Sequence, residues 1–200
     1  MPKIVVSNIV SLDGFYAAPD GNPLLLNMDE AFDLYNRERI EDAGTVLLGR
    51  ESFLGFSSYW PDIADAPDDP DNRALDDDNR RISRAYNRVA KVVVSDTLVV
   101  PEDNAWHSTT TVIPRSGLSA WVAEHRTNGS ADAVVFGSRV MWNALLVEGL
   151  LDEIHLMVSP TALGAGIPLF AGATDLTLLG TRQFDGSDNV LLRYAPRAPR

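Results

Sequence analysis

The chain has 200 residues, no cysteine and a formal net charge of −11 at pH 7. The lack of cysteine excludes disulfides, thiolate metal sites and a cysteine nucleophile, and the negative charge argues against a nucleic-acid partner, because attraction to phosphate requires a basic surface. No segment has the length of a membrane span and no signal peptide precedes the first apolar run, so we expect a single cytoplasmic domain over residues 1–200 that does not bind a membrane.

The first expected elements are a strand and a helix. A β-rich apolar run covers residues 3–10 and is followed by Asp13 at the end of the strand. Asn27 is placed as a helix N-cap, with Glu30 at the third helical position. Apolar residues then recur at helical spacing, which predicts a helix over residues 27–43.

The remaining elements follow from apolar runs separated by turn-forming residues. Further strands are expected over residues 45–48, 91–95, 110–113, 133–136, 153–159, 176–184 and 190–194, and helices over residues 51–59, 82–88, 117–126 and 139–148. Alternating strands and helices predict parallel crossovers, and the turn at 185–188 predicts a C-terminal antiparallel hairpin. The fold class is therefore α/β, with a mixed, mainly parallel sheet of about eight strands. The acidic segment at about 61–80 is interpreted as a solvated loop without a site.

Two glycines follow buried strands and precede helices. Gly49 and Gly137 each predict a tight turn that directs backbone N–H groups and the positive helix end at one ligand. Two such turns in a short chain suggest a ligand with separated phosphates, such as a dinucleotide. Arg50 would meet a phosphate and Ser52 would supply a hydroxyl, whereas in the alternative interpretation Glu51 merely complements the helix dipole. The spacing of a classical Rossmann fingerprint is missing.

Candidate groups also follow two other strands. Ser95 and Arg115 lie where parallel strands end, which is the edge at which open α/β sheets bind ligands. Among acid/base candidates, Asp13 and Asp33 are placed better than the three histidines, which share no metal-ligand spacing, and we expect no metal site. The alternative for Asp33 is an ordinary i,i+4 pair with Arg37. Hydrolase, metalloprotease and nucleoside-triphosphatase motifs are absent from the sequence.

Five segments in order resemble one known family. They are residues 11–15, 44–50, 91–95, the stretch from Phe136 to Glu153, and the ending from Pro160 to Phe170. Together they resemble the dihydrofolate reductase superfamily, and most closely the reductase domain of riboflavin biosynthesis, also called the bifunctional deaminase-reductase C-terminal domain, as a stand-alone member. The resemblance implies a three-layer fold, with helices on both faces of the central sheet, and an NADPH-dependent oxidoreductase.

The resemblance also implies which residues hold the cofactor. The family's cofactor positions fall on Thr45, Gly49, Arg50, Glu51, Ser52, Ser95, Arg115, Gly137, Ser138, Arg139, Val140 and Met141. Ser138 stands where the family has a second glycine, and serine tolerates such a turn less well. Asp96 beside Ser95 would favour NADH unless Arg50 and Arg115 outweigh its charge.

Three residues, and the lack of an arginine cluster in the sequence, limit the class of substrate that the resemblance allows. Asp33 falls where dihydrofolate reductases carry the carboxylate that binds the substrate, with Phe32 packed under the cofactor ring, while Arg37 counts against folate. No arginine cluster follows the first strand to hold a phosphorylated ribose. We therefore expect hydride transfer to a small pterin- or pyrimidinone-like substrate, with a non-catalytic or regulatory nucleotide-binding protein as the alternative. Apolar surface on residues 145–151, 176–184 and 190–194 predicts a homodimer.

Overall fold

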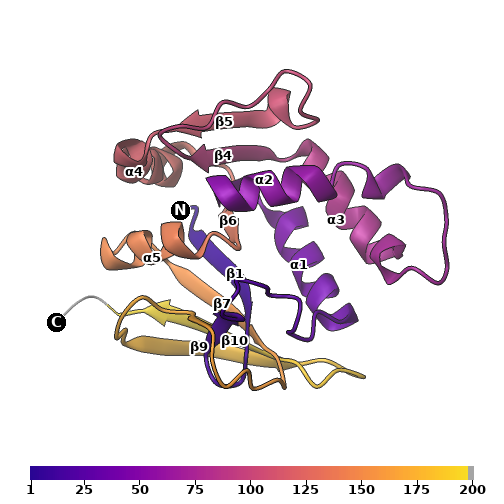
Figure 1. The fold of residues 1–200 in the computed structure, drawn as a ribbon. Helices are drawn as coiled ribbons and strands as arrows, with labels where there is room; N and C mark the ends of the chain where they lie inside the picture. The colour runs from indigo at the N-terminus through magenta and orange to yellow at the C-terminus, as the bar shows by residue number, and fades with distance from the viewer. Residues whose placement is uncertain (198–200) are drawn as a thin grey trace.

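The computed structural model describes residues 1–197 (Figure 1). Residues 198–200 of the expected domain lie outside the described residues. The strands are β1 (Ile4–Val10), β2 (Phe15–Ala17), β3 (Thr45–Gly49), β4 (Ala90–Val94), β5 (Thr110–Ile113), β6 (Ala133–Phe136), β7 (Glu153–Val158), β8 (Ile167–Pro168), β9 (Leu176–Gln183) and β10 (Val190–Pro196). The helices are α1 (Glu30–Asp42), α2 (Arg50–Tyr59), α3 (Asp77–Arg88), α4 (Leu118–Asn128) and α5 (Arg139–Val147). Short 3₁₀ turns include η1 (Ile63–Asp65) and η2 (Arg73–Leu75).

The central sheet has eight strands in the order β5-β4-β3-β6-β1-β7-β10-β9. All neighbouring pairs from β5 to β7 are parallel, so the carboxyl ends of these strands meet at one edge. β10 pairs antiparallel with both β7 and β9, which forms the C-terminal hairpin. The expected mixed, mainly parallel sheet and its hairpin are confirmed. A second, two-stranded sheet of β2 and β8 was not expected.

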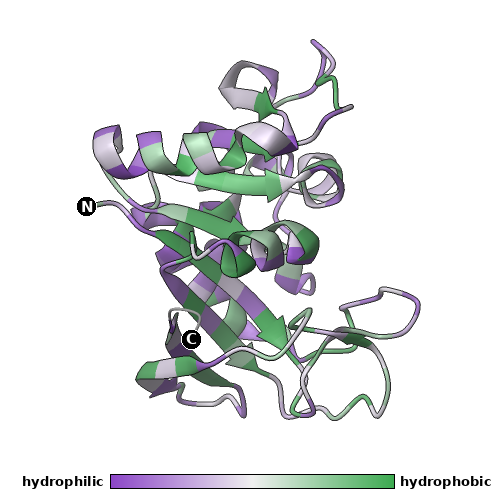
Figure 2. Ribbon diagram, turned by 90° about the vertical axis from the view of Figure 1, so that its left-hand side faces the viewer, coloured by the Kyte–Doolittle hydropathy of each residue, from purple (hydrophilic) through white to green (hydrophobic). Residues whose placement is uncertain are grey.

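Helices cover both faces of the sheet (Figure 1). On one face, Ile40 of α1, Phe53 of α2 and Tyr86 of α3 pack in one core cluster against β3, β4 and β6. On the other face, Val122 of α4 and Trp142 of α5 pack against β1, β6 and β7. The central strands are mostly apolar, as Figure 2 shows, because both of their faces are covered, and Ser7, Asn8, Lys91 and His155 are buried polar exceptions. No helix among residues 1–197 is long and apolar enough to cross a membrane.

The start of α1 differs from the sequence-based expectation. The N-cap is Asp29, whose carboxylate accepts hydrogen bonds from the backbone N–H groups of Ala31 at 3.1 Å and Phe32 at 3.2 Å. Asn27 is not the cap, because its side-chain amide instead donates to Asp29 at 2.9 Å. Aspartate and asparagine are equally good caps, so residue type alone could not predict which one is used, and the hydrogen bonds of Asp29 identify it as the cap.

The acidic segment is more ordered than expected. It contains η1 and η2, and α3 already begins at Asp77, with Asp76 as the N-cap that accepts from the Asn79 backbone at 2.8 Å. The Arg80 guanidinium donates to the carbonyl oxygens of Ala64 at 3.2 Å and Ala66 at 2.8 Å and so fixes the segment to α3. The segment is therefore held next to α1, where it contributes to the site described below.

Candidate functional site

The two glycine turns contact each other directly through serine side chains. Ser138 Oγ accepts a hydrogen bond from the Gly49 N–H at 2.9 Å, and Ser52 Oγ accepts one from the Ser138 N–H at 2.8 Å. Gly137 and Ser138 both have left-handed backbones, with φ of 57° and 52°. A Cβ atom at Gly137 would lie 2.9 Å from Ser52 Oγ, so the close approach of the turns requires glycine there.

The N-terminal ends of α2 and α5 remain open to a ligand. Within residues 1–197, neither helix has a side-chain hydrogen bond at its N-cap, although helix N-termini usually have one. The positive ends of both helices therefore lie side by side with unused backbone donors in their first turns. This arrangement fits the pyrophosphate of a dinucleotide, even though serine hydroxyls already engage the N–H groups of Gly49 and Ser138.

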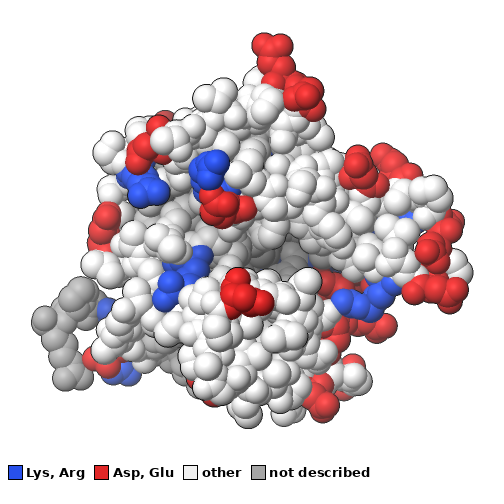
Figure 3. All heavy atoms as spheres, in the orientation of Figure 1, with Lys and Arg blue, Asp and Glu red and all other residues white. Residues whose placement is uncertain are grey.

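The expected arginines are paired with carboxylates or carbonyls. Arg50 forms an ion pair with its neighbour Glu51, and Arg115 Nε lies 3.5 Å from an Asp96 carboxylate oxygen. Arg139 donates to the Pro168 carbonyl. Figure 3 shows charges of both signs around a hollow on this face. The Glu51 and Asp96 side chains of these pairs are 83% and 53% exposed, so water can solvate either carboxylate when a ligand phosphate takes its place beside the arginine.

Four other expected cofactor residues occupy different environments. Thr45 opens β3 and pairs with Ala90 and Ala133, so it lies at the opposite end of the strand from Gly49 and is not brought to the turns. Val140 is exposed on α5, whereas the Met141 side chain belongs to the core. Ser95 follows β4 at the correct edge, where its Oγ accepts from the Leu98 backbone at 3.0 Å.

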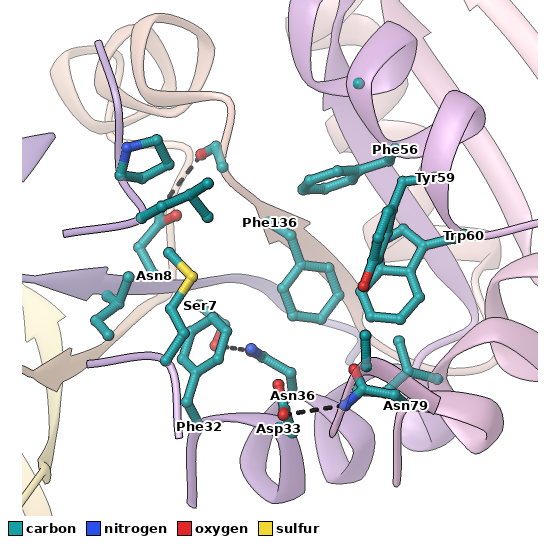
Figure 4. A pocket seen from close by; sticks show the side chains of 18 of the residues that line it. Ser7, Asn8, Phe32, Asp33, Asn36, Phe56, Tyr59, Trp60, Asn79 and Phe136 are labelled. Atoms are coloured by element: carbon teal, nitrogen blue, oxygen red, sulfur yellow. Dashed lines mark hydrogen bonds between the residues drawn. The ribbon is translucent and has the colours of Figure 1, made fainter. Parts of the chain in front are cut away.

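A cavity of about 740 Å³ lies beside the turns (Figure 4). Gly137 and Tyr16 belong both to its wall and to the surroundings of the turns. The lining is mainly apolar and rich in aromatic rings, and comes chiefly from β1, β6, α1, α2, α3 and the segment before α3. It includes Met28, Phe32, Phe56, Tyr59, Trp60, Tyr86 and Phe136 together with the polar residues Ser7, Asn8, Asp33, Asn36, Arg73 and Asn79. A site of this volume and polarity is typical of a small-molecule pocket.

Asp33 is the carboxylate within this cavity. Its side chain accepts a hydrogen bond from the Asn79 amide at 3.0 Å and forms an ion pair with Arg73. Arg73 also donates a hydrogen bond to the Met28 carbonyl. Burial raises the pKa of Asp33, against the opposing effects of Asn79 and Arg73. The alternative pair with Arg37 is wrong, because Arg37 reaches Asp78 on α3 instead.

Asp13, the second acid/base candidate, lies outside the cavity lining. It accepts hydrogen bonds from Ser11 Oγ at 2.6 Å and from the backbone N–H groups of Leu163 at 3.1 Å and Gly164 at 2.7 Å. The bond from Ser11 is the main reason that the pKa of Asp13 is lowered. The structure therefore separates the two carboxylates and gives Asp13 the contacts of a loop anchor.

The sequence matches the family model described as the RibD C-terminal domain over residues 2–190. The chain belongs to this family. Uncharacterized protein YyaP of Bacillus subtilis (strain 168) is 25% identical over 185 residues, which cover 91% of this chain and 89% of the relative. The match to the RibD C-terminal domain confirms the resemblance seen in the sequence.

Solved structures confirm the fold of this RibD C-terminal domain protein. The putative riboflavin biosynthesis protein of Shewanella sp. PV-4 superposes with a TM-score of 0.67 at 19% identity and covers 98% of this chain and 99% of its own. RibD of Acinetobacter baumannii gives 0.68 at 18% identity over 98% of this chain, which spans only 58% of that longer protein. A pyrimidine reductase-like protein of Corynebacterium diphtheriae gives 0.59 at 15% identity over 99% and 93% of the two chains.

Several cavity residues were missed in the sequence. Arg73 and Asn79 contact Asp33, yet both come from the segment that was interpreted as a solvated loop without a site. One signal was available, because Arg73 is the only basic residue between positions 62 and 78. The aromatic wall formed by Phe56, Tyr59 and Trp60 was not singled out either, since aromatic residues on a helix are usually core residues.

Proposed function

We propose that this RibD C-terminal domain protein is an NADPH-dependent reductase that transfers hydride to a small pterin- or pyrimidinone-like heterocycle. The observation that carries the proposal is the position of Asp33. It is a buried carboxylate in an aromatic cavity, and Gly137 of the turn pair forms part of the wall of that cavity. A proton-carrying group, a substrate-sized cavity and open helix N-termini thus adjoin one another, which is the combination that nicotinamide-dependent reduction requires.

The turn pair provides the residues that would hold the cofactor. The backbone donors in the first turns of α2 and α5 would bind the pyrophosphate, with Arg139 beside them. Arg50, Ser95 and Arg115 follow neighbouring parallel strands and would bind the adenosine 2′-phosphate. NADPH, when bound, supplies the hydride, and the protein's own residues supply orientation and the proton.

Asp33 would deliver the proton. Reduction of a C=N or C=O bond leaves negative charge that a proton must neutralise, directly or through a water molecule. Burial favours the protonated form of Asp33 and raises its pKa, which assists proton donation, while Asn79 and Arg73 act in the opposite direction. The Asn79 amide, 3.0 Å from Asp33, orients the carboxyl group within the cavity.

The proposal is tested by measuring NADPH oxidation with purified protein and a panel of dihydropterins, pyrimidinones and simple imines. We expect turnover with at least one heterocycle, and tighter binding of NADPH than of NADH. Binding of NADPH without turnover across the panel would instead support a regulatory nucleotide-binding protein. No binding of either nucleotide would overturn the reductase proposal.

We also propose that the protein is a homodimer. β9 is an edge strand of the central sheet, and it exposes Leu178 and Leu179. An exposed apolar edge strand favours pairing with a second chain. In the apolar stretch at 145–151, Leu145 and Leu151 are buried within the chain, whereas Val147 is exposed and would be available to a second chain.

A further inference from the structure

Among residues 1–197, the cavity lining has one cation, the Arg73 guanidinium, and it is already paired. Asp33 and Arg73 are the charged residues in its lining, and they pair with each other. Arg73 uses a second guanidinium nitrogen to donate to the Met28 carbonyl. An incoming dianion would have to break both contacts and would then lie beside the uncompensated carboxylate of Asp33.

Basic residues on the neighbouring elements are engaged as well. Arg37 on α1 pairs with Asp78, and Arg80 on α3 donates to the Ala66 carbonyl and to Asp68. Arg73 and Ala74 enter the wall from the aspartate-rich segment, which therefore surrounds this side of the cavity with negative charge. On this side of the cavity, the aspartates of the segment therefore oppose the approach of an anion.

The shape of the wall suits a flat ring system. In Figure 4, Phe56, Tyr59 and Trp60 gather on one side of the cavity, and Phe32 lies on the other side. The Trp60 ring is stacked on Tyr86, with centroids 5.5 Å apart and an interplanar angle of 26°. Aromatic surfaces held in fixed orientations bind planar ligands by stacking and by exclusion of water.

Three polar side chains of the lining lie together near the bottom of Figure 4. Asp33, Asn36 and Asn79 are neighbours in Figure 4, and Asn36 accepts a hydrogen bond from Ser7 Oγ at 3.3 Å. Carboxylate and amide groups complement the N–H and C=O groups at the edge of a heterocycle. The cavity thus combines flat apolar walls with one polar edge, where hydrogen-bonding groups could recognise an uncharged ligand.

We propose that this cavity binds an uncharged, planar, polycyclic heteroaromatic molecule and discriminates against phosphorylated ones. The inference rests on the proposed function only in that the same cavity is the substrate site. The proposed ligand class differs from that of a reductase that binds a ribose phosphate through basic residues.

Riboflavin and its 5′-phosphate, FMN, form a matched pair of probes. Titration followed by tryptophan fluorescence and by calorimetry, without any nicotinamide cofactor, measures both dissociation constants. We expect riboflavin to bind about tenfold more tightly than FMN, since the phosphate would enter a lining whose one cation, Arg73, is already paired with Asp33. Equal or tighter binding of FMN, or no binding of riboflavin, overturns the proposal.

A charge-insertion pair tests the cause of the discrimination. Leu24 lines the cavity and is exposed, whereas its neighbour Leu25 is exposed and does not line the cavity. Leu24→Arg adds a cation at the wall, so we expect it to reduce the preference for riboflavin to about threefold or less. Leu25→Arg adds the same charge to the same loop and should leave the preference unchanged. An equal effect of both variants would mean that net charge, and not the cavity, sets the preference, and would overturn the proposal.

The failure of this inference is distinguishable from failure of the reductase proposal. Turnover of a phosphorylated acceptor with a lower KM than its unphosphorylated form would overturn the ligand class and leave the reductase intact. Preferential binding of riboflavin by a protein that binds neither NADPH nor NADH would support the ligand class and overturn the reductase.

Discussion

The Oγ atom of Ser138 accepts a hydrogen bond from the backbone N–H of Gly49 at 2.9 Å, across 89 positions of sequence. The bond joins the turn after β3 to the turn after β6 and holds the N-termini of α2 and α5 side by side. A serine that replaces glycine at such a turn costs backbone strain, and here the hydroxyl compensates by linking the two turns.

Two substitutions at Ser138 separate these contributions. Ser138→Ala loses the hydrogen bond but keeps a side chain at φ of 52°, so we expect the free energy of unfolding to fall by about 1–2 kcal/mol. Ser138→Gly loses the same bond but relieves the strain, and should recover about 1 kcal/mol relative to alanine. Urea denaturation of the three proteins measures both differences. A Ser138→Ala protein as stable as the wild type would show that the bond between the turns does not contribute.

Asp33→Asn removes the proposed proton donor and keeps the side-chain volume. We expect turnover to fall by about 100-fold, with NADPH affinity nearly unchanged, because the group acts on the substrate and not on the nucleotide. Steady-state kinetics and nucleotide titration measure the two effects. Asp13→Asn is the matched control, and its carboxylate anchors Leu163 and Gly164 outside the cavity. Normal turnover in Asp33→Asn with loss in Asp13→Asn would transfer the acid role to Asp13.

Selectivity for NADPH over NADH is expected to depend on two exposed arginines. Arg50→Ala and Arg115→Ala should each weaken NADPH binding by roughly tenfold and leave NADH binding almost unchanged, because each removes a charge-assisted bond to the 2′-phosphate. Asp96→Asn removes the carboxylate that faces Arg115 and should strengthen NADPH binding. The exposed Arg84 of α3 supplies the control, since Arg84→Ala should alter neither constant. Unchanged NADPH affinity in both arginine variants would refute the assignment.

His155 is expected to make stability depend on pH. It is buried on β7 between Tyr35 and Glu153, each 2.8 Å from a ring nitrogen, and burial lowers its pKa from the usual 6.5 despite the nearby Glu153. At pH values below about 6.5, the unfolded chain therefore binds a proton that the folded protein does not bind. Stability contributed by this residue is present above this pH and is lost as the pH falls further.

Thermal unfolding between pH 7.5 and pH 5 tests this dependence, a range that brackets the ordinary histidine pKa of about 6.5. The wild type should lose stability more steeply on acidification than His155→Gln, which cannot take up the proton. His107→Gln, which changes an exposed histidine, should keep the wild-type slope. Parallel curves for the wild type and His155→Gln would contradict the expected effect.

The proposed homodimer is expected to depend on β9. Light scattering of the wild type should give about twice the chain mass of 21.8 kDa. Replacing Leu178 and Leu179 together by lysine should give a monomer with an unchanged fold, because charges on an edge strand oppose pairing. The exposed Val99 offers a control, since Val99→Lys changes a surface away from β9. A monomeric wild type at micromolar concentration would rule out the dimer.

The sequence by itself determined the fold class and the order of the central strands and of the helices, whereas the short strands β2 and β8 could not be predicted from it. The predicted elements follow from local patterns, namely apolar runs, helical spacing and glycine turns, each carried by residues close together in the chain. The family was indicated by the resemblance of five segments that follow one another in the family's order. The prediction that Asp33 faces a ligand also came from the sequence, and the structure places it in the cavity.

Only the tertiary structure decided what surrounds that carboxylate. Arg73 and Asn79 reach Asp33 from 40 and 46 positions away, and Ser138 reaches Gly49 from 89 positions away. Contacts of this kind depend on how α1 packs against α3 and on how β3 pairs with β6, and neither is encoded in local spacing. Propensity describes a residue's own segment, whereas a binding site forms where distant segments meet because their apolar faces are buried together.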